Sequence, residues 1–280
     1  MKEKAAFLRH VILWLTVILV LTGTGCLRKP APKPDMPRVA HGVMLDGLAV
    51  GNMTGQELTG LVTALESQEN RSPVNARFDD LTGDILPGNT GRAINAGATV
   101  ERVMAAAAGS LVQVQYRILW PEITENKLRQ ARLIGRYRSP LLDSTPARVQ
   151  NILQTTRLVN NTVLPVENEF SFNRTTGEPT LARGFQKAAV FAADGQTVQE
   201  VGGGMCQVSS TLYCAVRQAG LPVTERHPHS RPVAYVPPGY DATTYTDKNF
   251  RFVNARRHPL IIRAWTDNRQ VTVDLWELML

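Results

Sequence analysis

The sequence predicts an α+β protein in two parts, a small N-terminal α+β domain followed by a larger mixed α+β domain that begins near residue 134. Three observations carry this prediction. Some segments have apolar residues at helical spacing and others alternate between apolar and polar residues. A glycine run leads directly into an amphipathic segment, which places Cys206 at a helix N-terminus. Residues 260–265 and 270–276 have the pattern of two strands joined by a turn, which predicts a C-terminal β-hairpin.

Residues 1–26 have the order of an export segment, in which basic residues precede an apolar run and then small residues. The apolar run is shorter than the roughly 20 residues of a membrane-spanning helix. Cys26 follows small residues, as the attachment cysteine of a bacterial lipoprotein does, although Gly23 stands where a larger aliphatic residue is usual. We expect lipidation at Cys26, with an uncleaved anchor or simple secretion as alternatives, and a protein that works outside the cytoplasm.

A proline-rich linker at residues 27–40 is expected to be extended, and it leads to a predicted α+β domain at residues 41–128. This domain contains no nucleophile or metal-ligand pattern, so we expect a binding or spacer role. Its predicted elements are a strand with a turn at Asp46-Gly47, a helix that starts with a capping box of Thr54 and Glu57, a strand at 74–78, a helix within 95–108 and an alternating strand at 111–118.

The second domain, residues 134–280, is expected to hold any chemistry that the chain performs. Its predicted elements are a helix at 147–159, strands at 169–173 and 184–193, the helix after the glycine run, strands at 232–237 and 250–254, and the terminal hairpin.

The composition is that of a globular protein, with 43% hydrophobic residues and a net charge of +7. A basic surface suits nucleic acid, anionic lipid or an anionic cell-wall polymer, or it simply keeps the protein soluble. Cys206 and Cys214 lie two helical turns apart, about 12 Å of rise, which is too far for a disulfide. An exported protein without a disulfide framework that keeps a thiol after a glycine run suggests that the thiol is used.

Cys206 is the candidate nucleophile, because the start of a helix favours a thiolate over a thiol. Gly203 and Gly204 lack side chains and permit close approach of a substrate carbonyl. Backbone N–H groups there could form an oxyanion hole, with Gln207 as a side-chain donor and Ser209 as a further substrate-binding residue. The alternative is a buried structural cysteine in a tight contact between a helix and a strand. A phosphate loop is disfavoured, because its lysine and Ser/Thr are absent.

A thiol nucleophile needs a base, and we favour His229 over His227 because His229 directly precedes a strand-like segment. Asp241 could fix the tautomer of His229, or it could simply cap a turn. His227 and Arg231 are candidate substrate-binding residues. A zinc site from Cys206, His227 and His229 is conceivable, but no CxxC or HxxxH spacing supports it. We therefore expect neither a metal nor a cofactor.

Several long motifs closely resemble the VanW family, and they span about residues 134–276. The preceding region, with Gly42-Val-Met-Leu-Asp-Gly and Gly51-Asn-Met-Thr-Gly-Gln-Glu-Leu, is similar to the peptidoglycan-binding domain that often precedes VanW. The VanW-like motifs are Phe170-Ser-Phe-Asn, Gly177, Gly202-Gly-Gly-Met-Cys-Gln-Val-Ser-Ser-Thr-Leu-Tyr, Glu225-Arg-His-Pro-His-Ser-Arg-Pro-Val-Ala-Tyr-Val-Pro-Pro-Gly-Tyr-Asp-Ala-Thr and Phe252-Val-Asn.

The resemblance implies L,D-transpeptidase-like chemistry on peptidoglycan stem peptides, because some VanW-domain proteins have been linked to it through a cysteine. Cys206 would attack the carbonyl between the third and fourth stem residues, and the acyl group would pass to an amine or to water. The chain departs from the family pattern at Cys214, where another residue is usual. The expected partners are peptidoglycan stem peptides and, through the anchor, the membrane, but not nucleic acid. The alternative is a non-catalytic peptidoglycan-binding or scaffold protein.

Overall fold

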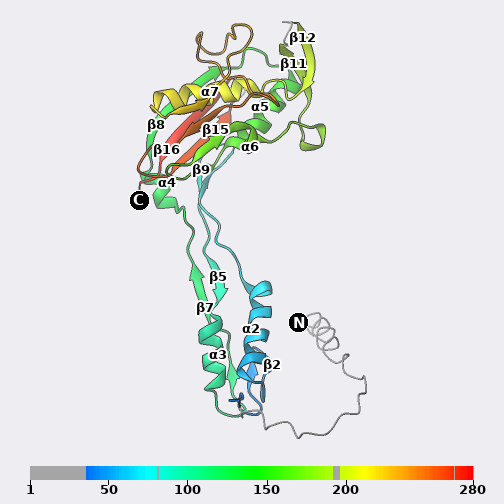
Figure 1. Cartoon of the computed structure of the whole chain (residues 1–280), viewed down its shortest axis with the longest axis vertical. Helices are drawn as coiled ribbons and strands as arrows, with labels where there is room; N and C mark the ends of the chain where they lie inside the picture. The colour runs from blue at the N-terminus through cyan, green and yellow to red at the C-terminus, as the bar shows by residue number, and fades with distance from the viewer. Residues whose placement is uncertain (1–35, 81, 192–195, 268, 280) are drawn as a thin grey trace, which may run out of the picture. The chain divides into compact units, whose positions relative to one another are not determined.

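The structure is a computed structural model that describes residues 36–80, 82–191, 196–267 and 269–279. Helices and strands alternate in a mixed α+β arrangement, as the sequence predicts (Figure 1). Cys26 and the predicted export segment lie outside the described residues. Within the described ranges, no helix has the length and apolar character to span a membrane. The chain divides into two compact units, one with residues 36–58 and 102–112, the other with 59–101 and 113–279.

The first unit is built on a tight hairpin between β1 (Met44–Leu45) and β2 (Leu48–Ala49). The predicted turn is confirmed: Asp46 and Gly47 both have positive φ, 44° and 84°, which matches the twist of a two-residue hairpin. The third strand, β6 (Leu111–Val112), pairs parallel to β1.

The predicted capping box begins α2 (Gly55–Glu69). The backbone N–H of Thr54 donates to a carboxylate oxygen of Glu57 at 2.8 Å, and the N–H of Glu57 donates to Thr54 Oγ1 at 3.3 Å. These reciprocal bonds satisfy two N–H groups that the first turn of a helix leaves without partners.

The prediction of one strand over residues 111–118 is wrong, because β6 and β7 (Tyr116–Leu119) belong to different sheets. The residue between them, Gln115, is held at the start of α3 (Ala96–Met104). Its N–H donates to Thr99 Oγ1 at 3.1 Å, and its carbonyl accepts from the N–H of Asn95 at 2.7 Å. The other elements of this part of the chain are β3 (Arg77–Phe78), β4 (Ile85–Leu86), β5 (Gly91–Ile94), which pairs with β7, and α4 (Glu125–Gln130).

An antiparallel four-stranded sheet is the centre of the second unit (Figure 1). Its last two strands form the predicted C-terminal hairpin, and α5 (Pro146–Val159) and α7 (Met205–Gln218) pack against the sheet. A Cβ at Gly135 would lie 2.3 Å from the carbonyl oxygen of Ala215, so glycine is required where α7 crosses the sheet. In spatial order the strands are β8 (Arg132–Pro140), β16 (Gln270–Glu277), β15 (Leu260–Thr266) and β9 (Thr162–Leu164).

Two smaller sheets lie within residues 169–253 of the second unit. The strand predicted at residues 232–237 is wrong: this segment forms turns, and Pro232 and Pro237 lack the N–H that a strand ladder needs. The first of these sheets has the strands β10 (Glu169–Ser171), β14 (Arg251–Val253) and β13 (Val223–Glu225) in this order. The second is a hairpin of β11 (Lys187–Phe191) and β12 (Thr197–Val201). The short helix α6 (Phe172–Thr176) directly follows β10.

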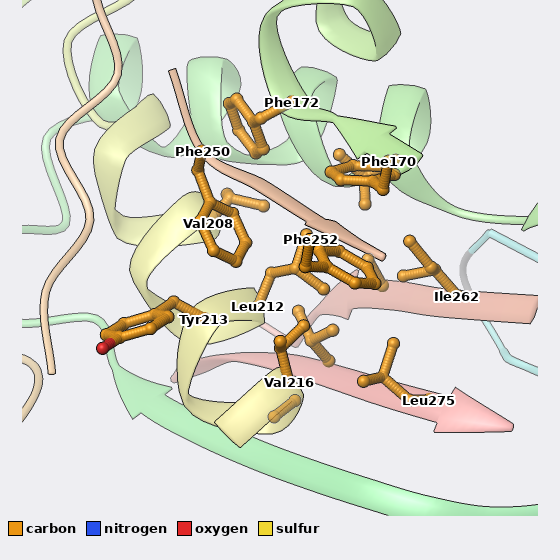
Figure 2. Packing of buried hydrophobic residues seen from close by; sticks show 14 of the residues in the cluster. Phe170, Phe172, Val208, Leu212, Tyr213, Val216, Phe250, Phe252, Ile262 and Leu275 are labelled. Atoms are coloured by element: carbon orange, nitrogen blue, oxygen red, sulfur yellow. The ribbon is translucent and has the colours of Figure 1, made fainter. Parts of the chain in front are cut away.

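The main hydrophobic core lies between α7, α5 and the sheets (Figure 2). Phe170 stacks on Phe252 with ring centroids 5.0 Å apart, and Tyr213 meets Phe250 edge-on at 5.6 Å. Leu212 of α7 is fully buried beside these rings. Because one face of α7 is held by this packing, the start of the helix is a rigid platform for side chains.

Candidate active site

The glycine run positions the first turn of α7 and therefore Cys206. Gly202 and Gly204 have φ of 91° and 115°, which few residues other than glycine adopt. A Cβ at Gly203 would lie 2.6 Å from the carbonyl oxygen of Ala188 in β11. The side-chain amide of Asn151 in α5 donates to the carbonyl of Gly203 at 2.9 Å. The run is thus fixed on two sides before the helix begins.

Asp241 holds His229 through two short hydrogen bonds. The backbone N–H of His229 donates to Asp241 Oδ2 at 2.6 Å, and Nδ1 of the same residue lies 2.7 Å from that oxygen. Arg226 fixes the aspartate in turn: Nη2 donates to Oδ1 at 2.8 Å and Nε donates to the backbone carbonyl at 2.6 Å. The side chains of His229 and Asp241 are each 12% exposed, so the pair is largely withdrawn from water.

Cys206 is the third member of the cluster. Its Sγ lies 3.5 Å from the carbonyl oxygen of Thr244 and 3.8 Å from Thr244 Oγ1. The imidazole of His229 is close enough to act on the thiol, because its hydrogen-bonding capacity and its charge lower the pKa of Cys206. Because Nδ1 is occupied by Asp241, Nε2 is the ring nitrogen that serves the thiol. The structure therefore brings Cys206, His229 and Asp241 together, in the order of a nucleophile, a base and an orienting carboxylate.

The surroundings favour charged forms of all three groups. Burial alone would raise the pKa of the Cys206 thiol, but the hydrogen bond and charge of His229 outweigh it, so the pKa is lowered. Burial would lower the pKa of His229, but Cys206 and Asp241 outweigh it and raise that pKa. Burial also opposes ionisation of Asp241, yet the hydrogen bonds from His229 lower its pKa. Cys206 and His229 thus each favour the charged form of the other, a thiolate beside an imidazolium.

Two serines of α7 hold the loop that carries Asp241. Ser209 Oγ donates to the carbonyl of Ala242 at 2.6 Å, and Ser210 Oγ accepts from the N–H of Ala242 at 2.9 Å. Ser210 Oγ also donates to the carbonyl of Cys206 at 2.7 Å. Ser209 is fully buried in these contacts. The expectation that Ser209 meets substrate is therefore corrected: it ties the loop to the helix.

Fewer N–H donors are available for an oxyanion hole than the sequence predicts. Gln207 is 2% exposed, and its amide nitrogen donates to Ser139 Oγ at 3.2 Å and to the carbonyl of Pro140 at 2.8 Å. Both of its side-chain N–H groups are thereby used, so Gln207 is not an oxyanion donor. The backbone N–H groups of Met205 and Gln207 donate to the carbonyls of Gly202 and Gly204. Over the described part of the chain, the backbone N–H groups of Gly204 and Cys206 remain as candidate donors.

The other two predicted substrate-binding residues lie at different places. His227 pairs with Glu225, with 3.0 Å between Nε2 and Oε1, and its side chain is 38% exposed. Arg231 is exposed, and it lines a cavity of about 260 Å³ that also includes His229 and Asp241. The zinc alternative finds no support, because the described residues contain no group of three His, Cys, Asp or Glu side chains that could hold a metal.

Both cysteines of α7 are free, but their environments differ. Cys214 is buried and donates to the carbonyl of Tyr240 at 3.3 Å. Burial raises the pKa of Cys214 to about 12, so it stays protonated where Cys206 is ionised. Only Cys206 therefore has the properties of a nucleophile.

Two residues without a predicted role, Tyr235 and Arg148, lie beside the cluster. The ring of Tyr235 meets the ring of His229 almost at a right angle, with centroids 6.5 Å apart. Burial and the charge of Cys206 raise the pKa of its phenol, and Ser210 is its hydrogen-bond partner. Arg148 of α5 packs its side chain against the position of Gly204. Tyr235 lies within the Glu225–Thr243 motif, six residues after His229, but its residue type gave it no role, whereas Arg148 lies outside the motifs and reaches the site through long-range packing.

Comparisons with known proteins agree with this region of the chain. A family model described as "VanW like protein" matches residues 147–276. A Bacillus subtilis protein whose name reads "Uncharacterized protein YoaR" is 34% identical over 215 residues, which cover 75% of this chain and 70% of the relative. No solved structure matches. The chain therefore belongs to the VanW family and is a cell-envelope-related protein.

Proposed function

We propose that this protein is a cysteine acyltransferase that acts on peptidoglycan stem peptides outside the cytoplasm, in the manner of an L,D-transpeptidase. The N-terminal segment would anchor it at the membrane. The single observation that carries the proposal is the cluster of Cys206, His229 and Asp241 at the start of α7, in which the thiol pKa is lowered and the imidazole pKa is raised. Family membership supplies the cell-envelope context.

The first half of the reaction is acylation of Cys206. The thiolate attacks the carbonyl carbon of the amide between the third and fourth stem residues, and the carbonyl oxygen takes up negative charge. The N–H groups of Gly204 and Cys206 are the candidates to stabilise that charge. When the C–N bond breaks, His229 gives its proton to the departing amine and a thioester remains.

The second half transfers the acyl group. An amine of a neighbouring stem attacks the thioester carbonyl, neutral His229 accepts the proton of that amine, and the thiolate of Cys206 leaves. The products are a new amide crosslink and the original thiolate–imidazolium pair, and no oxidation state changes. Water in place of the amine gives a shortened stem with a new carboxylate.

The directions of the pKa shifts of Cys206 and His229 determine how the acylation rate depends on pH. The thiolate forms as the pH rises through the lowered pKa of Cys206, and the imidazolium is lost as the pH rises through the raised pKa of His229. Acylation needs both charged groups, so its rate is expected to rise and then fall with pH. Asp241 widens the pH range of acylation, because its carboxylate stabilises the imidazolium.

The experiment incubates the full-length protein with purified tetrapeptide muropeptides and analyses the products by mass. Wild type is expected to give crosslinked or shortened products and a transient thioester on Cys206, and Cys206→Ala is expected to give neither. Cys214→Ala is the matched control, because it removes the same group from the same helix two turns away. Identical product profiles for wild type and Cys206→Ala would refute the proposal and favour a non-catalytic binding or scaffold role.

A further inference from the structure

Arg148 is a largely buried cation whose charge is weakly paired among the residues that the structure describes. It lies in the first turn of α5, and its side chain is 16% exposed. Its Nε is 4.0 Å from Asp143 Oδ2, at the outer limit of an ion pair, and its Nη1 donates to the carbonyl of Ala189 at 3.3 Å. A guanidinium has five N–H donors, and buried arginines normally meet a carboxylate at close range. Capacity for another anionic partner therefore remains.

The side chain lies at the start of α7, next to the reactive cysteine. A Cβ at Gly204 would be 3.1 Å from Cγ of Arg148, so the arginine stem rests on the glycine that caps the helix of Cys206. The charges of Arg148 and Cys206 both act on the pKa of the Tyr235 phenol, the first lowering it and the second raising it. Arg148 and Cys206 belong to α5 and α7, two helices that pack together.

The contact of Asp143 with Arg148 is one that a carboxylate of a substrate could replace. The side chain of Asp143 is 42% exposed, and this residue precedes α5 in a segment without regular structure. Asp143 also accepts from the backbone N–H of Thr145 at 2.9 Å, a bond that would persist if Arg148 turned to another carboxylate. A planar guanidinium binds a carboxylate through two parallel hydrogen bonds, which a contact at 4.0 Å with Asp143 does not achieve.

We propose that Arg148 is a specificity-determining residue that binds a carboxylate of the acyl donor beside the scissile amide. This inference rests on the proposed acyl transfer. The donor it selects is a peptide in which the departing residue ends in a free carboxylate, so that cleavage is confined to the end of a stem. An interior peptide bond, or a donor whose terminal carboxylate is amidated, lacks the group that Arg148 binds.

The first test measures the anion site without any peptidoglycan. Iodoacetate and iodoacetamide alkylate the same Sγ and release the same iodide, but only iodoacetate carries a carboxylate. The ratio of the two rates, read at Cys206 by peptide mass mapping of the full-length protein, cancels the thiolate fraction. In Arg148→Gln we expect the ratio to fall by about tenfold, the size of one charge-assisted hydrogen bond.

Two controls define that result. Arg157→Gln removes the same charge from an exposed position of the same helix and is expected to leave the ratio unchanged. Asp143→Asn removes the competing carboxylate and is expected to raise the ratio, so the proposal stays testable if Arg148→Gln does not fold. A ratio that is unchanged in folded Arg148→Gln, or that does not rise in Asp143→Asn, overturns the anion site.

The second test compares two tetrapeptide donors that differ only in a free or amidated terminal carboxylate. Wild type is expected to use the free acid at least about tenfold better, and Arg148→Gln to lose this preference mainly through KM. Equal use of both donors by wild type overturns the substrate assignment while acyl transfer stands. Turnover of neither donor, with the iodoacetate preference intact, overturns acyl transfer and supports the anion site.

Discussion

Replacing Asp241 with asparagine is the sharpest test of how the site is held together. Its carboxylate accepts three short hydrogen bonds, from the backbone N–H of His229 at 2.6 Å, from His229 Nδ1 at 2.7 Å and from Arg226 Nη2 at 2.8 Å. Asparagine has one acceptor oxygen and one amide group. Its oxygen can accept either from His229 or from Arg226. Its NH2 group then faces the N–H donors of the other residue.

The expected loss of folding free energy follows from the number of hydrogen bonds that the variant loses. Asp241→Asn loses at least one charge-assisted hydrogen bond in a largely buried place, which costs about 1.5–3 kcal/mol of folding free energy. It also removes the negative charge that stabilises the imidazolium. The pKa of His229 should then fall and the pKa of Cys206 should rise, each by about one unit for every 1.36 kcal/mol of lost interaction. The midpoint of Cys206 alkylation is therefore expected to move up by about one pH unit.

The assay is the rate of iodoacetamide alkylation at Cys206 across pH, together with urea unfolding of the same variant. Asp46→Asn is the control, because it removes one carboxylate from an exposed turn whose positive φ asparagine tolerates. The control should reproduce the wild-type alkylation profile. If the Asp241→Asn profile also coincides with that of wild type in the folded protein, the account of the His229–Asp241 pair given above is wrong.

Three further variants test the scaffold and the site. Gly135→Ala would place a Cβ 2.3 Å from the carbonyl oxygen of Ala215, so we expect a loss of about 1–3 kcal/mol of unfolding free energy, measured by urea denaturation. Arg136→Met would remove both 2.6 Å hydrogen bonds that Arg136 donates to the fully buried Asp274, and we expect a loss of about 3–5 kcal/mol of unfolding free energy, measured in the same way. Tyr235→Phe keeps the ring but removes the hydroxyl, so we expect a changed acylation rate with an unchanged melting temperature, and a melting temperature that drops without any change in rate would contradict a role at the site.

Local signals in the sequence predicted the fold where short-range contacts determine it. The Thr54–Glu57 capping box, the Asp46-Gly47 turn, α7 and the C-terminal hairpin each depend on neighbours within a few residues. The strand predicted at 111–118 failed, because Gln115 is held by residues from α3 instead of by a sheet. β8 was missed because its arginines and glycine hide the strand pattern, although it pairs along its whole length with β16.

The same division applies to the site. Cys206, His229 and Asp241 could be chosen from residue type and spacing, because a glycine run and a His-Pro-His segment are visible in one dimension. Gln207 could not be judged in this way. Adjacent positions on a helix point about 100° apart, so the residue after the cysteine faces Ser139 and Pro140 in the sheet. Arg148 could not be chosen from the sequence, because packing between distant segments brings it to the start of α7.

The relative reactivity of the two thiols of α7 also reports whether the helix and the loop that carries Asp241 stay packed together. Cys214 is buried beneath the loop that carries Asp241 and holds its proton to high pH, whereas Cys206 is only partly buried and has a lowered pKa. In the native protein a thiol reagent should therefore modify Cys206 quickly and Cys214 only when the helix and loop separate. The ratio of the two modifications then measures how often this segment opens.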